Sequence, residues 1–194
     1  MATAATGQAA ESRRRLITEG YRALQAQFHA ERADYGVSGQ KYATEISGIC
    51  EQMGIDVILD YGAGKETLAE ALPQYRVVSY DPCIPHLAEP PDPHDLVVCT
   101  DVMEHIEPEL VDNVLDDVAR LAKKVVYFQI ATSPATKVLP DGRNAHICIQ
   151  PAEWWLAKLA DRWDVVRYEK LGLRSLLATC VPYPKEEAAN DGDH

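Results

Sequence analysis

Short apolar runs alternate with amphipathic segments along most of the chain. The runs are rich in Val, Ile and Leu, as buried strands are. They occupy residues 56–60, 76–81, 95–100, 124–131, 164–172 and 175–182. Segments with apolar residues on one helical face lie around them, at residues 11–32, 41–53, 65–72, 108–122 and 151–163. The pattern predicts two N-terminal helices followed by strands and helices in alternation.

This alternation predicts an α/β fold. We expect a doubly wound, mostly parallel, Rossmann-like sheet with helices on both faces. The last two strands are too close in sequence for a crossover, so we expect them to form a C-terminal antiparallel hairpin. We assign residues 1–54 to N-terminal helices that form a substrate lid, residues 55–183 to the α/β domain, and residues 184–194 to a disordered acidic tail. Ligands of such sheets bind at the carboxyl ends of the parallel strands.

The composition limits the kinds of binding partner and the cellular compartment that we expect for this protein. Of 194 residues, 46% are hydrophobic, and the formal charge of −11 disfavours a general nucleic-acid surface. No apolar run is long enough to cross a membrane, and no signal-peptide pattern is present. The five cysteines include no C-x-x-C pair, and the histidines show no zinc-type spacing. We therefore expect a cytoplasmic protein with reduced thiols and no metal site.

The stretch VILDYGAGKETL, residues 57–68, places a glycine turn between the first buried strand and a helix. Asp60, Gly62 and Gly64 lie in this turn, and Asp81 ends the next strand, where an acid can accept hydrogen bonds from ribose hydroxyls. A dinucleotide would place its pyrophosphate at the helix N-terminus, where Glu66 would repel it. The turn therefore favours a nucleoside cofactor without phosphates, such as S-adenosylmethionine, and disfavours a nicotinamide-dependent oxidoreductase.

Two further segments, VVSYDP at residues 77–82 and HDLVVCTDVMEHI at residues 94–106, sharpen this assignment. Together with the glycine turn, they make the chain similar to class I S-adenosylmethionine-dependent methyltransferases over roughly residues 55–182. The resemblance implies cofactor contacts from Asp60, Gly62 and Gly64 at the methionine part and from Asp81 at the ribose. It places residues 100–103, which include Asp101 and Val102, beside the methyl group.

The segment after Asp81 departs from that family. Five prolines lie between residues 82 and 94, where the family has a helix and another strand. Prolines at this density prevent a helix. We therefore expect the sheet to lack one edge strand and its helix, and we expect Pro82, Cys83 and Ile84 to supply a wall for the adenine.

Candidate catalytic groups follow the third and fourth strands. His146 is our first candidate for the base that removes the acceptor's proton, and His105 is the second. Asp101 stands where it can touch cofactor or substrate. Each histidine also has a structural interpretation: Glu104 and His105 can cap or pack against the next helix, and His146 can be a satisfied structural histidine. Both interpretations stay open.

Candidate substrate-binding residues lie in two loops. Arg143 and Asn144 belong to the long loop after the fourth strand, where Arg143 could bind a carboxylate or phosphate. The alternative is that PDGRN is an ordinary turn. Tyr35, Lys41 and Tyr42 precede the first strand and could close over the substrate. The alternative there is a helix cap with a solvated Lys41.

The sequence thus predicts an S-adenosylmethionine-dependent methyltransferase that acts on an O or N atom of a small polar or nucleotide-like metabolite. The alternative is a methyltransferase-like fold kept as a non-catalytic binding or regulatory protein. Glu66 and the short segment at residues 82–94 favour the alternative. The polar loop at residues 141–146 favours an enzyme.

Overall fold

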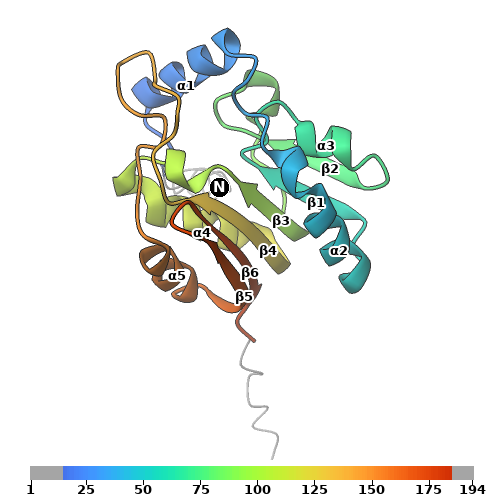
Figure 1. Ribbon diagram of the computed structural model, residues 1–194. Coiled ribbons are helices and arrows are strands. Elements are labelled where there is room, and N and C mark those ends of the chain that lie inside the picture. Colours follow the sequence, from blue (N-terminus) through green and yellow to red (C-terminus); the bar gives the residue numbers. More distant parts are fainter. Residues whose placement is uncertain (1–14, 185–194) are drawn as a thin grey trace, which may run out of the picture.

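A six-stranded sheet runs through the centre of the molecule (Figure 1). The computed structural model describes residues 15–184. The strands, in the order in which they lie side by side, are β2 (Arg76–Tyr80), β1 (Val57–Tyr61), β3 (His94–Thr100), β4 (Ala122–Ala131), β6 (Ser175–Pro182) and β5 (Trp163–Leu171). The strands β1 to β4 are parallel, and β6 pairs antiparallel with both β4 and β5.

The predicted α/β fold is confirmed, including the C-terminal antiparallel hairpin. Within residues 15–184, no strand pairs with the free edge of β2, so the sheet lacks the edge strand whose loss we predicted. The proline-rich connection from β2 to β3 contains one 3₁₀ turn, Pro85–Leu87, in its place. A short loop therefore borders the end of β2, where a crossover helix would otherwise lie.

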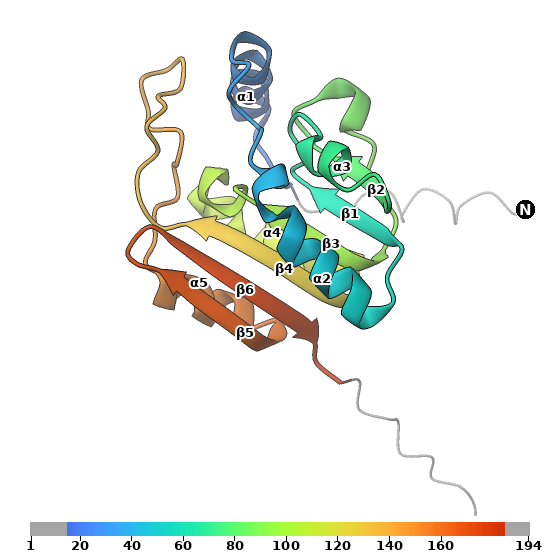
Figure 2. The same cartoon turned by 45° about the vertical axis from the view of Figure 1, so that its right-hand side comes forward.

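Helices cover both faces of the sheet (Figure 2). Their bounds are α1 (Glu19–Glu31), α2 (Ala43–Met53), α3 (Thr67–Ala71), α4 (Val111–Leu121) and α5 (Ala152–Ala160). Side chains of α2 and α3 pack with Ile58 on one face. Side chains of α4 and α5 pack with its neighbour Leu59 on the other. Because adjacent strand residues point to opposite faces, β1 is buried on both sides, as its continuous apolar run predicts.

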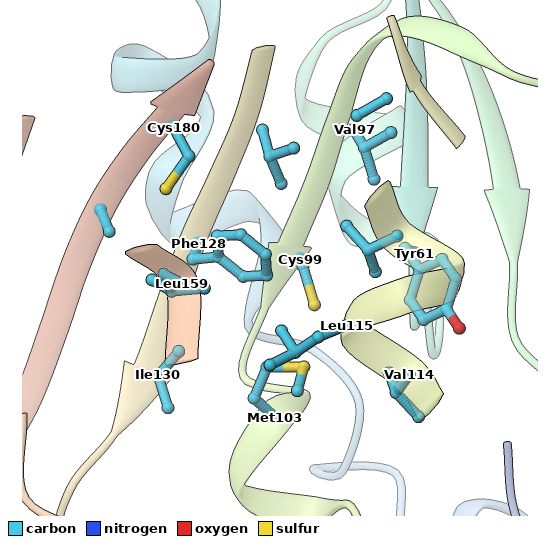
Figure 3. Packing of buried hydrophobic residues seen from close by; sticks show 14 of the residues in the cluster. Tyr61, Val97, Cys99, Met103, Val114, Leu115, Phe128, Ile130, Leu159 and Cys180 are labelled. Carbon is cyan, nitrogen blue, oxygen red and sulfur yellow. The ribbon is translucent and has the colours of Figure 1, made fainter. Parts of the chain in front are cut away.

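The core under α4 and α5 fixes the carboxyl ends of β3 and β4 (Figure 3). Met103, Leu115 and Phe128 are fully buried there. Burial of each such side chain contributes about 1.5–3 kcal/mol to folding. Met103 lies in the 3₁₀ turn Met103–His105, directly after β3, so this core also holds the segment that carries Asp101 and His105.

The first helix begins later than predicted, at Glu19 instead of residue 11. Thr18 is its N-cap, with Oγ1 accepting a hydrogen bond from the Tyr21 amide at 3.3 Å. The carboxylate of Glu107 accepts hydrogen bonds from the Thr18 amide at 2.8 Å and from its hydroxyl at 2.6 Å. These bonds attach the start of α1 to the segment that follows β3. Residues 11–14 of the predicted helix and residues 185–194 of the predicted tail lie outside the described residues.

The helix α1 packs on the long loop between β4 and α5. Tyr21 and Phe28 of α1 form a buried cluster with Leu139 and Ala145 of that loop. Both segments stand at the same end of the sheet (Figure 2). In the described part of the chain, none of the helices combines the length and the hydrophobicity that a bilayer span requires.

Candidate active site

The glycine turn after β1 is a point of close backbone contact. Gly62 has φ of 83° and Gly64 has φ of 54°, values that favour glycine. A Cβ at Gly62 would lie 2.4 Å from Cγ2 of Val102, and a Cβ at Gly64 would lie 2.6 Å from the carbonyl oxygen of Gly36. Both predicted glycines therefore stand where a side chain has no room, between the segment before the sheet and the segment after β3.

Asp81 holds this turn from the end of β2. Its Oδ2 accepts a hydrogen bond from the Gly64 amide at 3.1 Å, and its Oδ1 accepts one from the Cys83 amide at 2.9 Å. The side chain is buried and lines the larger of two neighbouring cavities. Because a carboxylate offers about four lone-pair sites, Asp81 keeps acceptor capacity for a ligand in this cavity.

Glu66 differs from its predicted position. It precedes α3 as the N-cap, with φ of 58°, rather than lying in the first helical turn. Its carboxylate makes no cap hydrogen bond and lies 3.7 Å from Nε2 of His86. The position that holds a glycine in the resembled family thus keeps a left-handed backbone here, although Glu66 carries a side chain.

Asp60 is buried at the end of β1 and lines a smaller cavity together with Gly62 and Asp101. Burial, together with the charges of Asp81 and Glu66, raises the pKa of Asp60 to about 7. The group therefore changes its charge near neutral pH, beside the glycine turn.

The larger cavity lies between α1, the glycine turn and the ends of β2 and β3. It has an empty volume of about 750 Å³, which includes open solvent. Lining residues include Tyr21, Tyr35, Gly62, Asp81, Asp101 and His105. The segment before the sheet closes one side, because the Gly36 carbonyl accepts a hydrogen bond from the Lys65 amide at 2.8 Å.

Four titratable side chains converge beside this cavity. Asp101, Glu104, His105 and His146 each offer one atom, and these atoms all lie within 4.8 Å of one another. We name these four residues the carboxylate–histidine cluster. The rings of the two histidines meet edge to face, with centroids 4.9 Å apart.

The two carboxyl groups of the cluster have opposite electrostatic environments. Burial alone would raise the pKa of Asp101, but the nearby His105 and the hydrogen bond from Ser38 Oγ at 2.8 Å lower it. Glu104 is fully buried, and burial together with the Asp101 charge raises its pKa well above the ordinary value. Without another cation, Asp101 is therefore the charged member and Glu104 the protonated one.

Each histidine of the cluster is oriented by a backbone carbonyl. Nδ1 of His105 lies 2.7 Å from the carbonyl oxygen of Ala145, and Nδ1 of His146 lies 2.7 Å from that of Ser133. A carbonyl oxygen accepts only, so each Nδ1 donates, and Nε2 keeps the lone pair in the neutral ring. Burial lowers the pKa of His105 to about 4, so its ring is neutral at pH 7.

Solved structures with a similar fold include methyltransferases. The 1,6-didemethyltoxoflavin-N1-methyltransferase of Burkholderia thailandensis, with bound S-adenosylhomocysteine, has a TM-score of 0.60 at 18% identity over 87% of this chain and 92% of its own. The N-methyltransferase NodS of Bradyrhizobium japonicum, also with S-adenosylhomocysteine, has a TM-score of 0.59 at 13% identity over 84% and 100% of the two chains. The chain has the class I methyltransferase fold. No protein-family model and no curated protein matches its sequence.

The methyltransferase fold brings most of the predicted cofactor residues together. Seven of them line the two cavities: Asp60, Gly62, Gly64, Asp81, Pro82, Asp101 and Val102. Cys83 also lines the larger cavity, whereas Ile84, the third predicted adenine contact, lines neither. The shortened connection after β2 thus still supplies a wall beside Asp81.

Two predicted substrate residues in the loop after β4 are instead used within that loop. Asn144 accepts hydrogen bonds from the amides of Ala135 and His146 and donates one to the Ala135 carbonyl. Arg143 pairs with Asp141 at 2.7 Å, and its guanidinium carbon lies 5.2 Å from the centroid of the Tyr21 ring. Neither residue lines either cavity.

Of the three predicted lid residues, only Tyr35 faces the larger cavity. Its hydroxyl donates to Gln25 Oε1 at 2.9 Å and lies 3.2 Å from Nδ1 of His105. Lys41 is exposed and donates to Ser38 Oγ, which agrees with the solvated alternative. Tyr42 packs with the side chains under α2, with its ring 6.3 Å from that of Tyr127.

Several lining residues have no counterpart among the predicted ones. Tyr21, Gln25 and His29 of α1 line the larger cavity, and Ser38 lines the smaller one. The sequence signal for the three α1 residues is their four-residue spacing, which places polar side chains on one face of the helix. It carries little information alone, since such spacing also describes a solvated helix face.

Proposed function

We propose that the protein is an S-adenosylmethionine-dependent methyltransferase that modifies an O or N atom of a small polar or nucleotide-like metabolite. The proposal rests on one observation: Gly62, Gly64 and Asp81 line the same cavity as His105. The named structural neighbours with bound S-adenosylhomocysteine support it, because they share the fold.

The lining residues fit this cofactor. Gly62 and Gly64 line the larger cavity without side chains, which allows the methionine part to approach the backbone closely. Buried Asp81 retains lone pairs for ribose hydroxyls, and Asp60 can accept from an ammonium group when ionised. Pro82 and Cys83 supply apolar wall for the adenine.

The protein's own groups would align the acceptor and take its proton. The cofactor supplies an electrophilic methyl group, which passes in line to the acceptor atom. Tyr21, Tyr35 and His105 surround the space in which that atom would lie. We propose His146 as the base through Nε2. His105 is the weaker candidate, because a pKa of about 4 makes a poor proton acceptor at neutral pH.

Replacing His146 by alanine is expected to lower turnover at least about 100-fold, the usual range for a lost general base. Affinity for S-adenosylmethionine should stay within about twofold, because His146 lines neither cofactor cavity. Formation of S-adenosylhomocysteine with a panel of small hydroxyl and amine acceptors measures turnover, and calorimetry measures affinity. His94→Ala, at the opposite end of β3, is the matched control and should retain full turnover. Unchanged turnover in His146→Ala would reject the assignment.

Affinity for S-adenosylmethionine should rise between pH 6 and pH 7.5. Asp60 has a pKa of about 7, so lowering the pH below 7 protonates it and removes an acceptor for the cofactor's ammonium group. The association constant should fall about tenfold for each pH unit well below 7 if binding requires the ionised group. Calorimetric titrations across this range measure the slope. Asp60→Asn should bind more weakly and show a flat profile; an equally steep slope in that variant would contradict the role of Asp60.

A further inference from the structure

The carboxylate–histidine cluster combines donors from three places in the chain. Asp101 follows β3, Glu104 and His105 lie in the next 3₁₀ turn, and His146 comes from the loop after β4. One atom from each lies within 4.8 Å of each of the others. Ligands around a first-row cation, with bonds of about 2.0–2.2 Å, are roughly 3–4 Å apart. Small side-chain adjustments would close the remaining gap.

The two imidazoles are oriented as metal ligands are. A ligating histidine almost always donates its other ring N–H to a carboxylate, a backbone carbonyl or a water. His105 and His146 both do this through Nδ1, to the carbonyls of Ala145 and Ser133. Each ring is therefore held with the Nε2 lone pair available. Neither the packing role of His105 nor the structural role of His146 requires that both rings donate Nδ1–H to a backbone carbonyl.

Glu104 supplies an independent observation. Its Oε1 accepts a hydrogen bond from the Ala131 amide at 2.7 Å, whereas Oε2 is buried and accepts none. The Asp101 carboxyl group can bond to it only when one of the two groups is protonated. The residue is fully inaccessible to solvent, and its ligand atom belongs to the cluster. An unpaired buried carboxyl oxygen costs folding free energy unless something binds it. A cation in the cluster would satisfy it.

Asp101 and the cavity give such a cation access. Asp101 has φ of 58°, a conformation that costs energy for a residue other than glycine. Its Oδ2 is held by the Ser38 hydroxyl at 2.8 Å. Asp101 and His105 line the larger cavity, whereas Glu104 and His146 do not. One side of the cluster is therefore closed by protein, and the other opens toward the cavity.

We propose that Asp101, Glu104, His105 and His146 bind one divalent first-row transition-metal cation. Two imidazole nitrogens and two carboxylate oxygens suit Zn²⁺, Fe²⁺ or Mn²⁺ better than Ca²⁺, which takes oxygen ligands. The open side leaves coordination positions for water or substrate, as catalytic sites do. The expectation from the sequence that no metal site exists rested on histidine spacing. The proposal replaces that expectation, because the fourth donor comes from a different loop.

The cation would also specify the acceptor, a step that rests on the proposed methyltransferase function. An acceptor hydroxyl bound to the cation would have a lowered pKa and would release its proton to solvent water at neutral pH. Its oxygen would then bond to the methyl carbon as the methyl–sulfur bond breaks and S-adenosylhomocysteine leaves. This favours an oxygen acceptor over a nitrogen one. His146 would then act as a ligand, and His146→Ala would lose turnover because the cation is lost.

Titration of the EDTA-treated, full-length protein with ZnCl₂ and MnCl₂, each alone, tests the proposal without any turnover. Calorimetry should show one site per chain. Glu104→Gln and His146→Ala should each weaken that site at least 10-fold, whereas His94→Ala should not. Pulsed electron paramagnetic resonance of the Mn²⁺ protein should show coupling to imidazole ¹⁴N, and this coupling should diminish in His146→Ala.

Circular dichroism of each variant shows whether it folds. Absence of binding at millimolar cation, or equal affinity in the folded wild type and both variants, would overturn the proposal. If His146→Ala loses turnover but keeps cation affinity, His146 is a base and not a ligand, and the four-ligand site is wrong. A separate titration with S-adenosylmethionine distinguishes the two proposals: cation binding without cofactor binding rejects the methyltransferase function and leaves the cation site standing.

Discussion

Gly64→Ala is expected to lose about 2–4 kcal/mol of unfolding free energy and to weaken S-adenosylmethionine binding at least about 10-fold. A left-handed φ of 54° costs an alanine about 1 kcal/mol. The new Cβ would also lie 2.6 Å from the Gly36 carbonyl oxygen, which is backbone and has no rotamer to change. The segment before the sheet must move away from the turn, and the cavity beside Asp81 then changes shape.

Gly172→Ala is the matched control for this change. Gly172 has a similar φ of 62° in the hairpin between β5 and β6, but its Cβ would meet no atom within 4 Å. It should lose only the conformational part, about 1 kcal/mol, and keep cofactor affinity. Urea unfolding and calorimetry measure both quantities. Equal losses of stability in the two variants would show that the contact between Gly64 and Gly36 does not constrain the turn.

Trp155→Ala is expected to cost about 3–5 kcal/mol of unfolding free energy. Its side chain is completely buried between α5 and the sheet, in the same core as Leu159 and Phe128. The neighbouring Trp154 is only partly buried, and Lys158 Nζ lies 5.4 Å from its ring centroid. Trp154→Ala should therefore lose about 1 kcal/mol, since partly exposed residues bury less apolar area.

Chemical unfolding monitored by circular dichroism compares the two tryptophan variants, because fluorescence would lose its probe. We expect the larger loss of unfolding free energy in Trp155→Ala. A loss of less than about 2 kcal/mol there, or an equal loss at Trp154, would mean that the packing between α5 and the sheet differs from the described one.

The sheet could be predicted because its information is local. The runs that form β1, β3 and β4 are continuous and apolar, which follows directly from burial on both faces. The start of α1 was misplaced because its position depends on Thr18 and its contact with Glu107, residues far apart in the sequence. Side-chain periodicity before residue 19 carries no sign of that contact.

The candidate site also contains residues that could be predicted from local sequence and residues that could not. Asp60, Gly62, Gly64 and Asp81 lie at strand ends, so the order of elements alone brings them together. Substrate binding by Arg143 and Asn144 stays a prediction; both side chains have partners within the loop, Asp141 and Ala135.

The carboxylate–histidine cluster could not be predicted from the sequence, because its assembly depends on how the loop after β4 folds back over the end of β3. From the sequence, Glu104 stands beside Asp101 and His105 at the junction of a strand and a helix, where it can also cap or pack against that helix. Its backbone carbonyl in fact accepts a hydrogen bond from the Cys148 amide at 2.9 Å, which brings that loop against the 3₁₀ turn. Such a contact between distant segments leaves no periodic or spacing signal in the sequence.

Calorimetric titration of the purified protein with S-adenosylmethionine, at pH 7.5 and beside a titration with NAD⁺, tests whether the protein binds this cofactor. We expect one S-adenosylmethionine per chain with micromolar affinity, at least 10-fold weaker binding by Asp81→Asn, and no measurable binding of NAD⁺, whose pyrophosphate would meet the charge of Glu66. Absence of heat with S-adenosylmethionine, together with an unchanged melting temperature at millimolar ligand, would contradict it.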